Sequence, residues 1–174
     1  MKAFLRGLEI CNQDEAYYLR PENILYVKAD GNYCDIHLTD GDVLESVSCQ
    51  RAEIARMIDT QLPSCLSQKF ALLGRSYLVN VEHIMYVNAG KQTLAFDINQ
   101  PGMCKKQTIK VSTEALRNLR ISLEGLFNVM QSSNMMETGG AINGGFTDYM
   151  ATPQKEKNYD VQEDEVKILG IRNT

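Results

Sequence analysis

Apolar and polar residues alternate in short runs along most of the chain, and turn signals separate the runs about every ten residues. From Tyr33 to Leu38 the alternation is regular, so that apolar residues fall on one side of the segment and polar residues on the other. Typical hairpin turns, Asp30-Gly31-Asn32 and Thr39-Asp40-Gly41-Asp42, flank this run. The pattern predicts a meander of short antiparallel strands with one buried face. The predicted strands cover residues 8–12, 16–19, 24–29, 33–38, 43–48, 70–73, 77–81, 84–87, 93–98 and 107–111, with a loop at 99–102.

Two stretches show helical spacing instead. Between residues 50 and 58 an apolar stripe follows Ser48, which we expect to cap a helix, whereas Arg51, Glu53 and Arg56 are read as lying off the stripe. A second stripe runs through residues 116–127 after a capping Ser112. We expect this second helix either to pack on the sheet or to pair with a second subunit. The apolar positions are Ala52, Ile54, Ala55 and Ile58 in the first stripe and Leu116, Leu119, Leu123 and Leu126 in the second.

The composition changes after residue 128. Residues 1–128 hold 14 Lys+Arg against 15 Asp+Glu, whereas residues 129–174 hold 4 against 7. Small and polar residues dominate the second part, which cannot bury enough apolar surface to offset the entropy of ordering. We therefore predict a domain over 1–128 and an acidic, mostly flexible tail over 129–174. The late apolar patch from Val166 to Ile171 either docks on the domain, binds a partner or forms a loose strand.

The residues that usually carry chemistry are sparse. The 5 cysteines contain no C-x-x-C pair and only two histidines are present, so reduced thiols are expected and a zinc site has little support. Ser76 has no local base, His83 is read as a structural histidine, and no glycine-rich phosphate loop occurs. We expect no enzyme activity, no metal and no cofactor. The N-terminus has no signal-peptide pattern and no apolar run reaches the length of a membrane span, so we expect a cytoplasmic protein.

Basic and polar residues instead gather at the breaks between strands. The apolar run Phe70–Leu73 breaks at Gly74-Arg75-Ser76 before the next strand, where a core strand pair has no need of an arginine. Lysines and hydroxyls suit phosphate oxygens, arginine can bond guanine and asparagine can bond adenine. Each position alone is also explained as a solvated loop, but together they favour loops that reach for nucleic acid. The net charge of -4 argues against a wholly basic nucleic-acid coat protein but does not exclude a locally basic face. The expected phosphate contacts are Lys28, Lys91 and Lys110.

Four segments in this order and spacing resemble the LytTR family of bacterial DNA-binding domains. They are the run from Asn23 to Tyr33, the hairpin through Thr39-Asp40-Gly41, the stretch Arg75–Asn80 with His83-Ile84, and the Val111-Ser112 step. The resemblance covers roughly residues 5–125. It implies a mostly β fold in which small antiparallel sheets stack in an elongated sandwich, with one amphipathic helix in the middle and one at the C-terminal end. It also implies binding to successive major grooves of double-stranded DNA through loops.

The resemblance assigns the candidate contacts one at a time. Asn32 matches the family's first base-contacting loop, Arg75 with Ser76 the second, and Thr113 the third, so that the three loops are expected on one edge. Many members carry a histidine where this chain has Gly74, and an arginine or lysine where it has Thr113. We therefore expect altered specificity at the third contact. Many members also follow a receiver domain, which does not fit before Leu8, so a stand-alone regulator is expected.

These features predict a sequence-specific DNA-binding transcription regulator. The partners considered are DNA, a second copy bound at paired repeats, and a regulatory protein held through the tail. The alternative, from a different class, is a β-rich protein-interaction module of a regulatory system, in which the tail and the leucine-rich helix bind another regulator without direct DNA contact.

Overall fold

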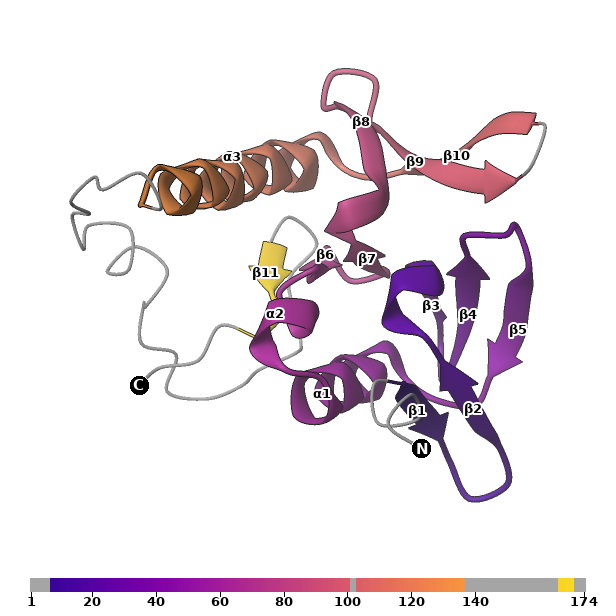
Figure 1. Ribbon diagram of the computed structural model, residues 1–174. Helices are drawn as coiled ribbons and strands as arrows, with labels where there is room; N and C mark the ends of the chain where they lie inside the picture. The colour runs from indigo at the N-terminus through magenta and orange to yellow at the C-terminus, as the bar shows by residue number, and fades with distance from the viewer. Residues whose placement is uncertain (1–6, 101–102, 137–165, 171–174) are drawn as a thin grey trace.

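The computed structural model describes residues 7–100, 103–136 and 166–170, whose strands form three antiparallel sheets (Figure 1). The largest is six-stranded, with the order β11-β6-β7-β3-β4-β5. Its central strand β3 pairs with β4 and β7, so both neighbours fix its position. The strands are β3 (Ile24–Asp30), β4 (Tyr33–Leu38), β5 (Val43–Val47), β6 (Phe70–Leu73), β7 (Tyr77–Asn80) and β11 (Val166–Ile168).

The other two sheets are smaller. One pairs β1 with β2, and the other has the order β10-β9-β8. Three helices and two single turns of 3-10 helix connect the strands in the described part of the chain. The strands are β1 (Leu8–Cys11), β2 (Ala16–Leu19), β8 (Ile84–Asn88), β9 (Thr93–Gln100) and β10 (Met103–Lys110). The helices are α1 (Arg51–Gln61), α2 (Ser64–Ser67) and α3 (Thr113–Met136), with short turns η2 (Pro21–Asn23) and η3 (Val81–His83).

Two hydrophobic clusters lie on opposite faces of the six-stranded sheet. On one face α1 and β1 pack over Val27, Ile36 and Leu72. On the other face β9, β10 and α3 pack over Leu25, Tyr26 and Ala71. In β6 this follows from the strand repeat, since the neighbours Ala71 and Leu72 point to opposite faces. In β3 the register shifts between Ile24 and Tyr26, and Leu25 and Tyr26 belong to the same cluster. The sheet is therefore the middle layer of the molecule.

Tyr26 joins the middle layer to the three-stranded sheet. Its ring stacks on His37 at 4.2 Å and on Phe96 at 5.1 Å between ring centroids. Its hydroxyl accepts a hydrogen bond of 3.2 Å from the Gln107 side chain. Stacked aromatic pairs of this kind contribute about 0.5–1.5 kcal/mol beyond their buried area. Tyr26 is thus a fixed point between β3, β4 and β9.

The mostly β prediction, with small antiparallel sheets and helices in the middle and after the last long hairpin, is confirmed. Some boundaries were wrong. β9 and β10 pair from Gln100 and Met103 onward, so residues 99–100 of the predicted 99–102 loop are strand, while residues 101–102 lie outside the described residues. The cap of α1 is Gln50, whose N–H donates to the Glu53 carboxylate at 3.0 Å, and not Ser48. Ser112 does cap α3, accepting from the N–H of Ala115 at 3.2 Å.

Two features bear on the predicted tail. α3 continues to Met136, so the boundary expected near residue 128 falls inside a helix. The apolar patch that begins at Val166 forms β11, which docks on the edge of β6. Of the three alternatives for this patch, the structure selects docking on the domain itself.

Asn80, at the end of β7, is a buried polar residue that ties three segments together. Its side chain is 1% exposed and donates to the Ile24 carbonyl at 3.0 Å, while its oxygen accepts from the N–H of Glu82 at 3.1 Å. Asn80→Ala would leave these groups without a partner, so we expect a loss of about 1–3 kcal/mol of unfolding free energy. Urea denaturation measures this loss. The exposed Asn23→Ala is the control, and equal stability of the two variants would contradict the role of the buried amide.

Candidate nucleic-acid interface

Two turns that carry candidate residues lie side by side at one end of the six-stranded sheet. β3 and β7 are antiparallel neighbours in which Lys28 pairs with Tyr77, so the end of β3 lies beside the start of β7. The turn after β3 holds Asn32, and the turn before β7 holds Arg75 and Ser76. A hydrogen bond of 2.7 Å from the Ala29 N–H to the Ser76 carbonyl joins the end of β3 to the turn before β7. Lys28, Asn32, Arg75 and Ser76 are all exposed, and we call these four residues the sheet-end group.

A buried arginine holds the turn that presents Arg75. The Arg51 guanidinium, in the first turn of α1, donates to the Gly74 carbonyl at 2.7 Å and to the Tyr77 carbonyl at 3.0 Å. Arg51 is 7% exposed, so these are charge-assisted bonds in a largely dry environment. Gly74 itself adopts a φ of 58°, which a residue with a side chain rarely takes. The turn is therefore fixed on both sides of Arg75, which projects from it.

Placing Arg51 off the apolar stripe of α1 was wrong. Three, four and seven residues separate it from Ile54, Ala55 and Ile58, which is the spacing of one helix face. The positive charge concealed this position, because a charged residue is ordinarily read as solvent-facing. The helical spacing of Arg51 from these buried residues was the sequence signal that could have placed it on the buried face of α1.

The same helix start also contacts the first turn. The Gln50 side-chain amide donates to the Asn32 side-chain oxygen at 3.1 Å. This bond orients the Asn32 amide and leaves its two N–H donors and the second lone pair of its oxygen for another partner. Gln50 was not among the predicted residues, and nothing in the local sequence links two positions 18 residues apart.

Lys28 lies in a row of titratable side chains on the face of the sheet beside these turns. Lys28 pairs across the strands with Asp35, and Tyr26 pairs with His37. Burial lowers the pKa of His37, the positive charge of Lys28 lowers it further, and Asp35 opposes the change. His37 is therefore neutral at pH 7. The charged members of this row are Lys28 and Asp35, whose opposite charges cancel.

The remaining candidates form a second group on the three-stranded sheet. Lys110, at the end of β10, donates from its ammonium group to the Lys91 carbonyl at 3.1 Å and to the Thr93 hydroxyl at 3.3 Å. Thr113, at the start of α3, donates its hydroxyl to the Ala89 carbonyl at 2.9 Å. Both contacts brace the β8–β9 turn, from which Lys91 projects into solvent. We call Lys91, Lys110 and Thr113 the hairpin group.

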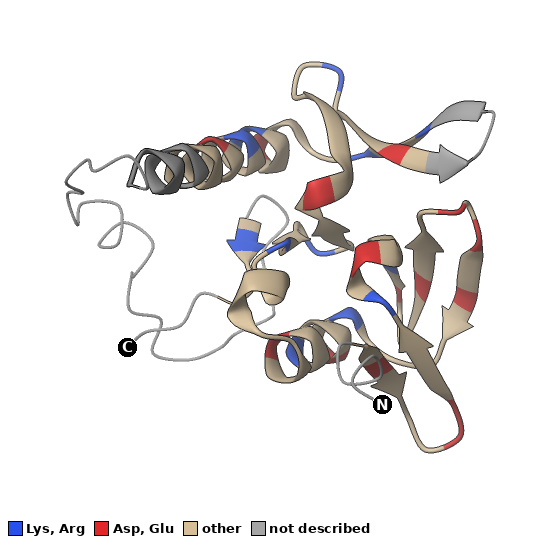
Figure 2. Cartoon of the chain, in the orientation of Figure 1, with Lys and Arg blue, Asp and Glu red and all other residues tan. Residues whose placement is uncertain are grey.

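The seven candidates are thus gathered in two groups on two different sheets. The half-buried Thr113 hydroxyl is engaged with Ala89, so in this arrangement its proton is not available to a phosphate. Figure 2 shows basic positions on the β8–β9 turn and along β10, whereas acidic positions concentrate on the β1–β2 and β4–β5 turns. The candidate groups therefore do not lie on the most acidic turns of the molecule.

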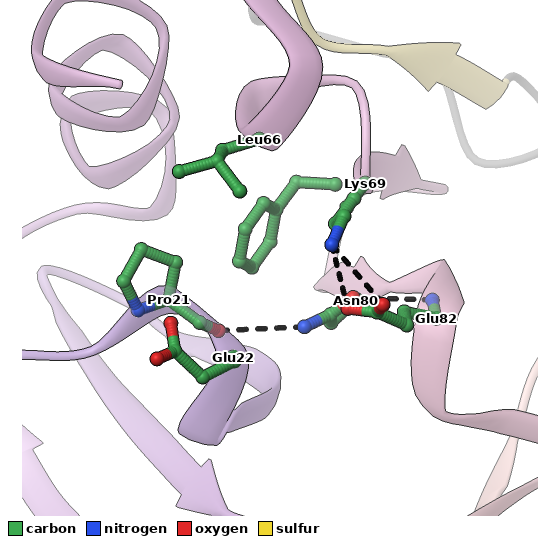
Figure 3. Close-up of a pocket in the computed structure, with 7 residues that line it drawn as sticks. Pro21, Glu22, Leu66, Lys69, Asn80 and Glu82 are labelled. Carbon is green, nitrogen blue, oxygen red and sulfur yellow. Dashed lines mark hydrogen bonds and ion pairs between the residues drawn. The ribbon is translucent and has the colours of Figure 1, made fainter. Parts of the chain in front are cut away.

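The opposite end of β7 holds a pocket of about 380 Å³, in which the side chains of Lys69, Asn80 and Glu82 are already paired (Figure 3). Lys69 and Glu82 form an ion pair at 3.1 Å, and the Asn80 amide donates to the Ile24 carbonyl at 3.0 Å and to the Pro21 carbonyl at 3.4 Å. His83 contacts the Glu22 carbonyl at 2.6 Å beside it, in agreement with a structural role. The pocket lies at the junction of η2, β6 and β7. Its lining residues are Pro21, Glu22, Leu66, Lys69, Phe70, Asn80 and Glu82.

The two buried thiols, Cys34 and Cys49, are held in the neutral form. Burial raises the pKa of Cys34 to about 11, and burial together with the Glu53 carboxylate raises the pKa of Cys49 to about 12.

No cluster of His, Cys, Asp and Glu suited to a metal occurs in residues 7–100, 103–136 and 166–170. In the same segments, no helix combines the length and apolar character needed to span a bilayer.

Comparison with known proteins defines the class of the chain. The family model described as LytTr DNA-binding domain matches residues 14–124. The chain therefore belongs to the LytTR family of DNA-binding domains, as its sequence motifs indicated. A solved LytTr DNA-binding domain of a putative methyl-accepting/DNA response regulator from Bacillus cereus is 14% identical, with a TM-score of 0.44, covering 68% of this chain and 96% of that one. No protein with a curated description matches the chain.

The Arg51 clamp generates a stability prediction. Arg51→Met would leave the Gly74 and Tyr77 carbonyls without the guanidinium, so we expect a loss of about 1.5–3 kcal/mol in denaturant unfolding. Arg56→Met is the matched control, since Arg56 is exposed on the same helix, and it should change stability by no more than about 0.5 kcal/mol. Amide exchange should also accelerate at residues 74–77 in Arg51→Met alone. Equal midpoints for the two variants would show that the clamp does not hold the turn.

Proposed function

We propose that this chain is a sequence-specific DNA-binding regulator of transcription that contacts major grooves through its loops. Membership of a DNA-binding domain family supports the coarse function. The single observation that carries the finer proposal is the fixed presentation of Arg75, an exposed arginine on a turn that a buried arginine anchors from behind. A rigid turn lowers the entropy lost when its side chain meets a base edge.

In this proposal the sheet-end group reads or positions bases. Arg75 bonds a guanine through its guanidinium, and Asn32 bonds an adenine through the amide that Gln50 orients. Ser76 and Lys28 add contacts to neighbouring phosphates. The two turns can act together because the pairing of β3 with β7 and the Ala29–Ser76 hydrogen bond hold the end of β3 beside the turn before β7.

The hairpin group supplies phosphate contacts in this proposal. Lys91 is exposed at the tip of a turn, and Lys110 keeps a third N–H donor beyond the two that brace this turn. Thr113 acts chiefly by holding the turn, since its hydroxyl donates to Ala89. A phosphate contact from Thr113 would require that bond to break, which agrees with the expectation of an altered third contact.

The remaining parts of the functional hypothesis follow from the class of the domain. We propose that the protein acts in the cytoplasm, where DNA is accessible, and that two copies bind paired repeats. We further propose that residues 1–128 carry DNA binding and that the acidic segment beyond them receives a regulatory partner. The excess of acidic residues after position 128 supports this division, because it disfavours direct DNA contact there.

Arg75→Ala tests the base-reading role. We expect the variant to lose about 1–3 kcal/mol on the specific site, or ~5- to 150-fold in Kd, while binding to random DNA changes little. The exposed position of Arg75 means that folding should be unaffected. Fluorescence anisotropy on promoter fragments, selected for binding to the parent protein, measures the effect.

Arg20→Ala is the matched control for Arg75→Ala. It removes the same charge from an exposed position just before η2, at the opposite end of β3 from Asn32. It should bind like the parent protein. If Arg75→Ala binds the specific site as tightly as Arg20→Ala does, the second loop does not read DNA.

Lys91→Ala tests the phosphate contacts. We expect a similar loss of affinity on specific and random DNA, because phosphates carry no sequence information. The slope of log Kd against log salt should fall by about 1, the signature of one lost phosphate contact. Lys69→Ala, which removes a lysine paired with Glu82, is the control and should keep the parent slope. An unchanged slope in Lys91→Ala would remove the hairpin group from the interface.

A further inference from the structure

The short strand β11 occupies the edge of β6 along its whole length. Val166, Lys167 and Ile168 pair with Leu73, Leu72 and Ala71. The Leu169 N–H then donates to the Phe70 carbonyl at 2.9 Å. Without this segment β6 would be an edge strand with a row of unpaired backbone groups. The backbone groups at this edge of β6 can therefore form hydrogen bonds with an extended peptide.

The side chains of the segment enter both hydrophobic clusters. Val166 and Ile168 pack with the cluster beneath α3. Leu169 is 2% exposed and belongs to the cluster beneath α1. Since side chains of a strand alternate in direction, a peptide at this edge can fill both faces only with apolar residues at these positions.

A narrow socket follows Leu169 and is suited to glycine. Gly170 has a φ of +73°, and a Cβ at this position would overlap the Ser67 hydroxyl and lie 3.1 Å from the Gln68 nitrogen. The Gly170 N–H donates to the Asp59 carboxylate at 3.1 Å, and Asp59 is 4% exposed. The socket therefore selects glycine, whose N–H can reach the Asp59 carboxylate without a side chain that would collide with Ser67.

The segment reaches this site from a distance along the chain. The family match ends at residue 124 and α3 ends at Met136, so residues 137–165 connect the helix to β11. These 29 residues can span up to ~100 Å when fully extended. Short strands that add to a sheet edge, with pockets for alternate side chains, are a general mode of peptide recognition.

We propose that the edge of β6 and the socket of Asp59, Ser67 and Gln68 form a strand-peptide binding site. Its occupant is residues 166–170 of this same chain, bound as a tethered ligand that can leave and return. The site recognises an extended apolar peptide that ends in Leu-Gly. Tethering gives the chain's own segment an effective concentration on the order of millimolar, so it outcompetes a free peptide of the same sequence. This proposal concerns a different edge from the DNA contacts and does not depend on them.

The test uses the full chain, a fluorescent synthetic peptide with the sequence of residues 164–172, and fluorescence anisotropy. In Gly170→Ala the tethered segment no longer fits the socket, so the vacated edge should bind the peptide at least ten times more tightly than the parent chain does. A second peptide with alanine in place of Gly170 should bind neither protein. The double variant Ser67→Gly with Gly170→Ala removes the overlap with the Ser67 hydroxyl but keeps the positive φ and the close Gln68 nitrogen. The tethered segment should therefore return in part, and the affinity for the free peptide should fall below that of Gly170→Ala but stay above that of the parent chain.

Leu169→Ala provides a milder variant that keeps the socket intact, and its peptide affinity should lie between those of the parent chain and Gly170→Ala. It also keeps the test valid if Gly170→Ala folds poorly. Equal peptide affinity in the parent chain, Leu169→Ala and Gly170→Ala would overturn the proposal. Equal binding of the glycine and alanine peptides to the variants would overturn it as well.

Discussion

The positive charge of Arg51 inside the protein constrains much of the surrounding structure. A buried charge is costly unless hydrogen bonds satisfy it, and the carbonyls of Gly74 and Tyr77 provide such bonds. The helix α1, the β6–β7 turn and the sheet therefore cannot shift independently. Because the neighbouring Gln50 holds Asn32, one turn of helix positions both loops at this end of the sheet. The start of α1, which lies behind the candidate interface, therefore holds both of its loops in place.

The sequence predicted the strands well where one face of each strand is buried, as from Tyr33 to Leu38. It failed where this physical signal is weak. The last long strand was predicted to begin at residue 107, but β10 begins at Met103 and includes Lys105 and Lys106, because strand pairing depends on the backbone. Arg51 was misplaced because its charge outweighed its spacing. Arg75 was selected as a candidate because it interrupts an apolar run, whereas the Gln50–Asn32 contact requires the tertiary structure.

The two groups of candidate residues differ in how their side chains are used. In the sheet-end group the bracing comes from other residues, which leaves Arg75 exposed for a partner. In the hairpin group Lys110 and Thr113 themselves brace the β8–β9 turn through the Lys91 and Ala89 carbonyls. A sequence motif cannot separate these cases, because the same residue types serve as supports and as contacts. The hydrogen bonds that each side chain makes in the structure distinguish a supporting residue from one that is available for contact.

The docking of β11 also changes what counts as the end of the domain. A chain that stopped at residue 124, where the family match ends, would lack the strand that covers β6 and the N–H that pairs with Asp59. Its exposed sheet edge would invite pairing with other chains. In topological terms the folded unit is discontinuous, built from residues 7–136 and 166–170. Residues 137–165 then join two parts of one domain, as an insertion does.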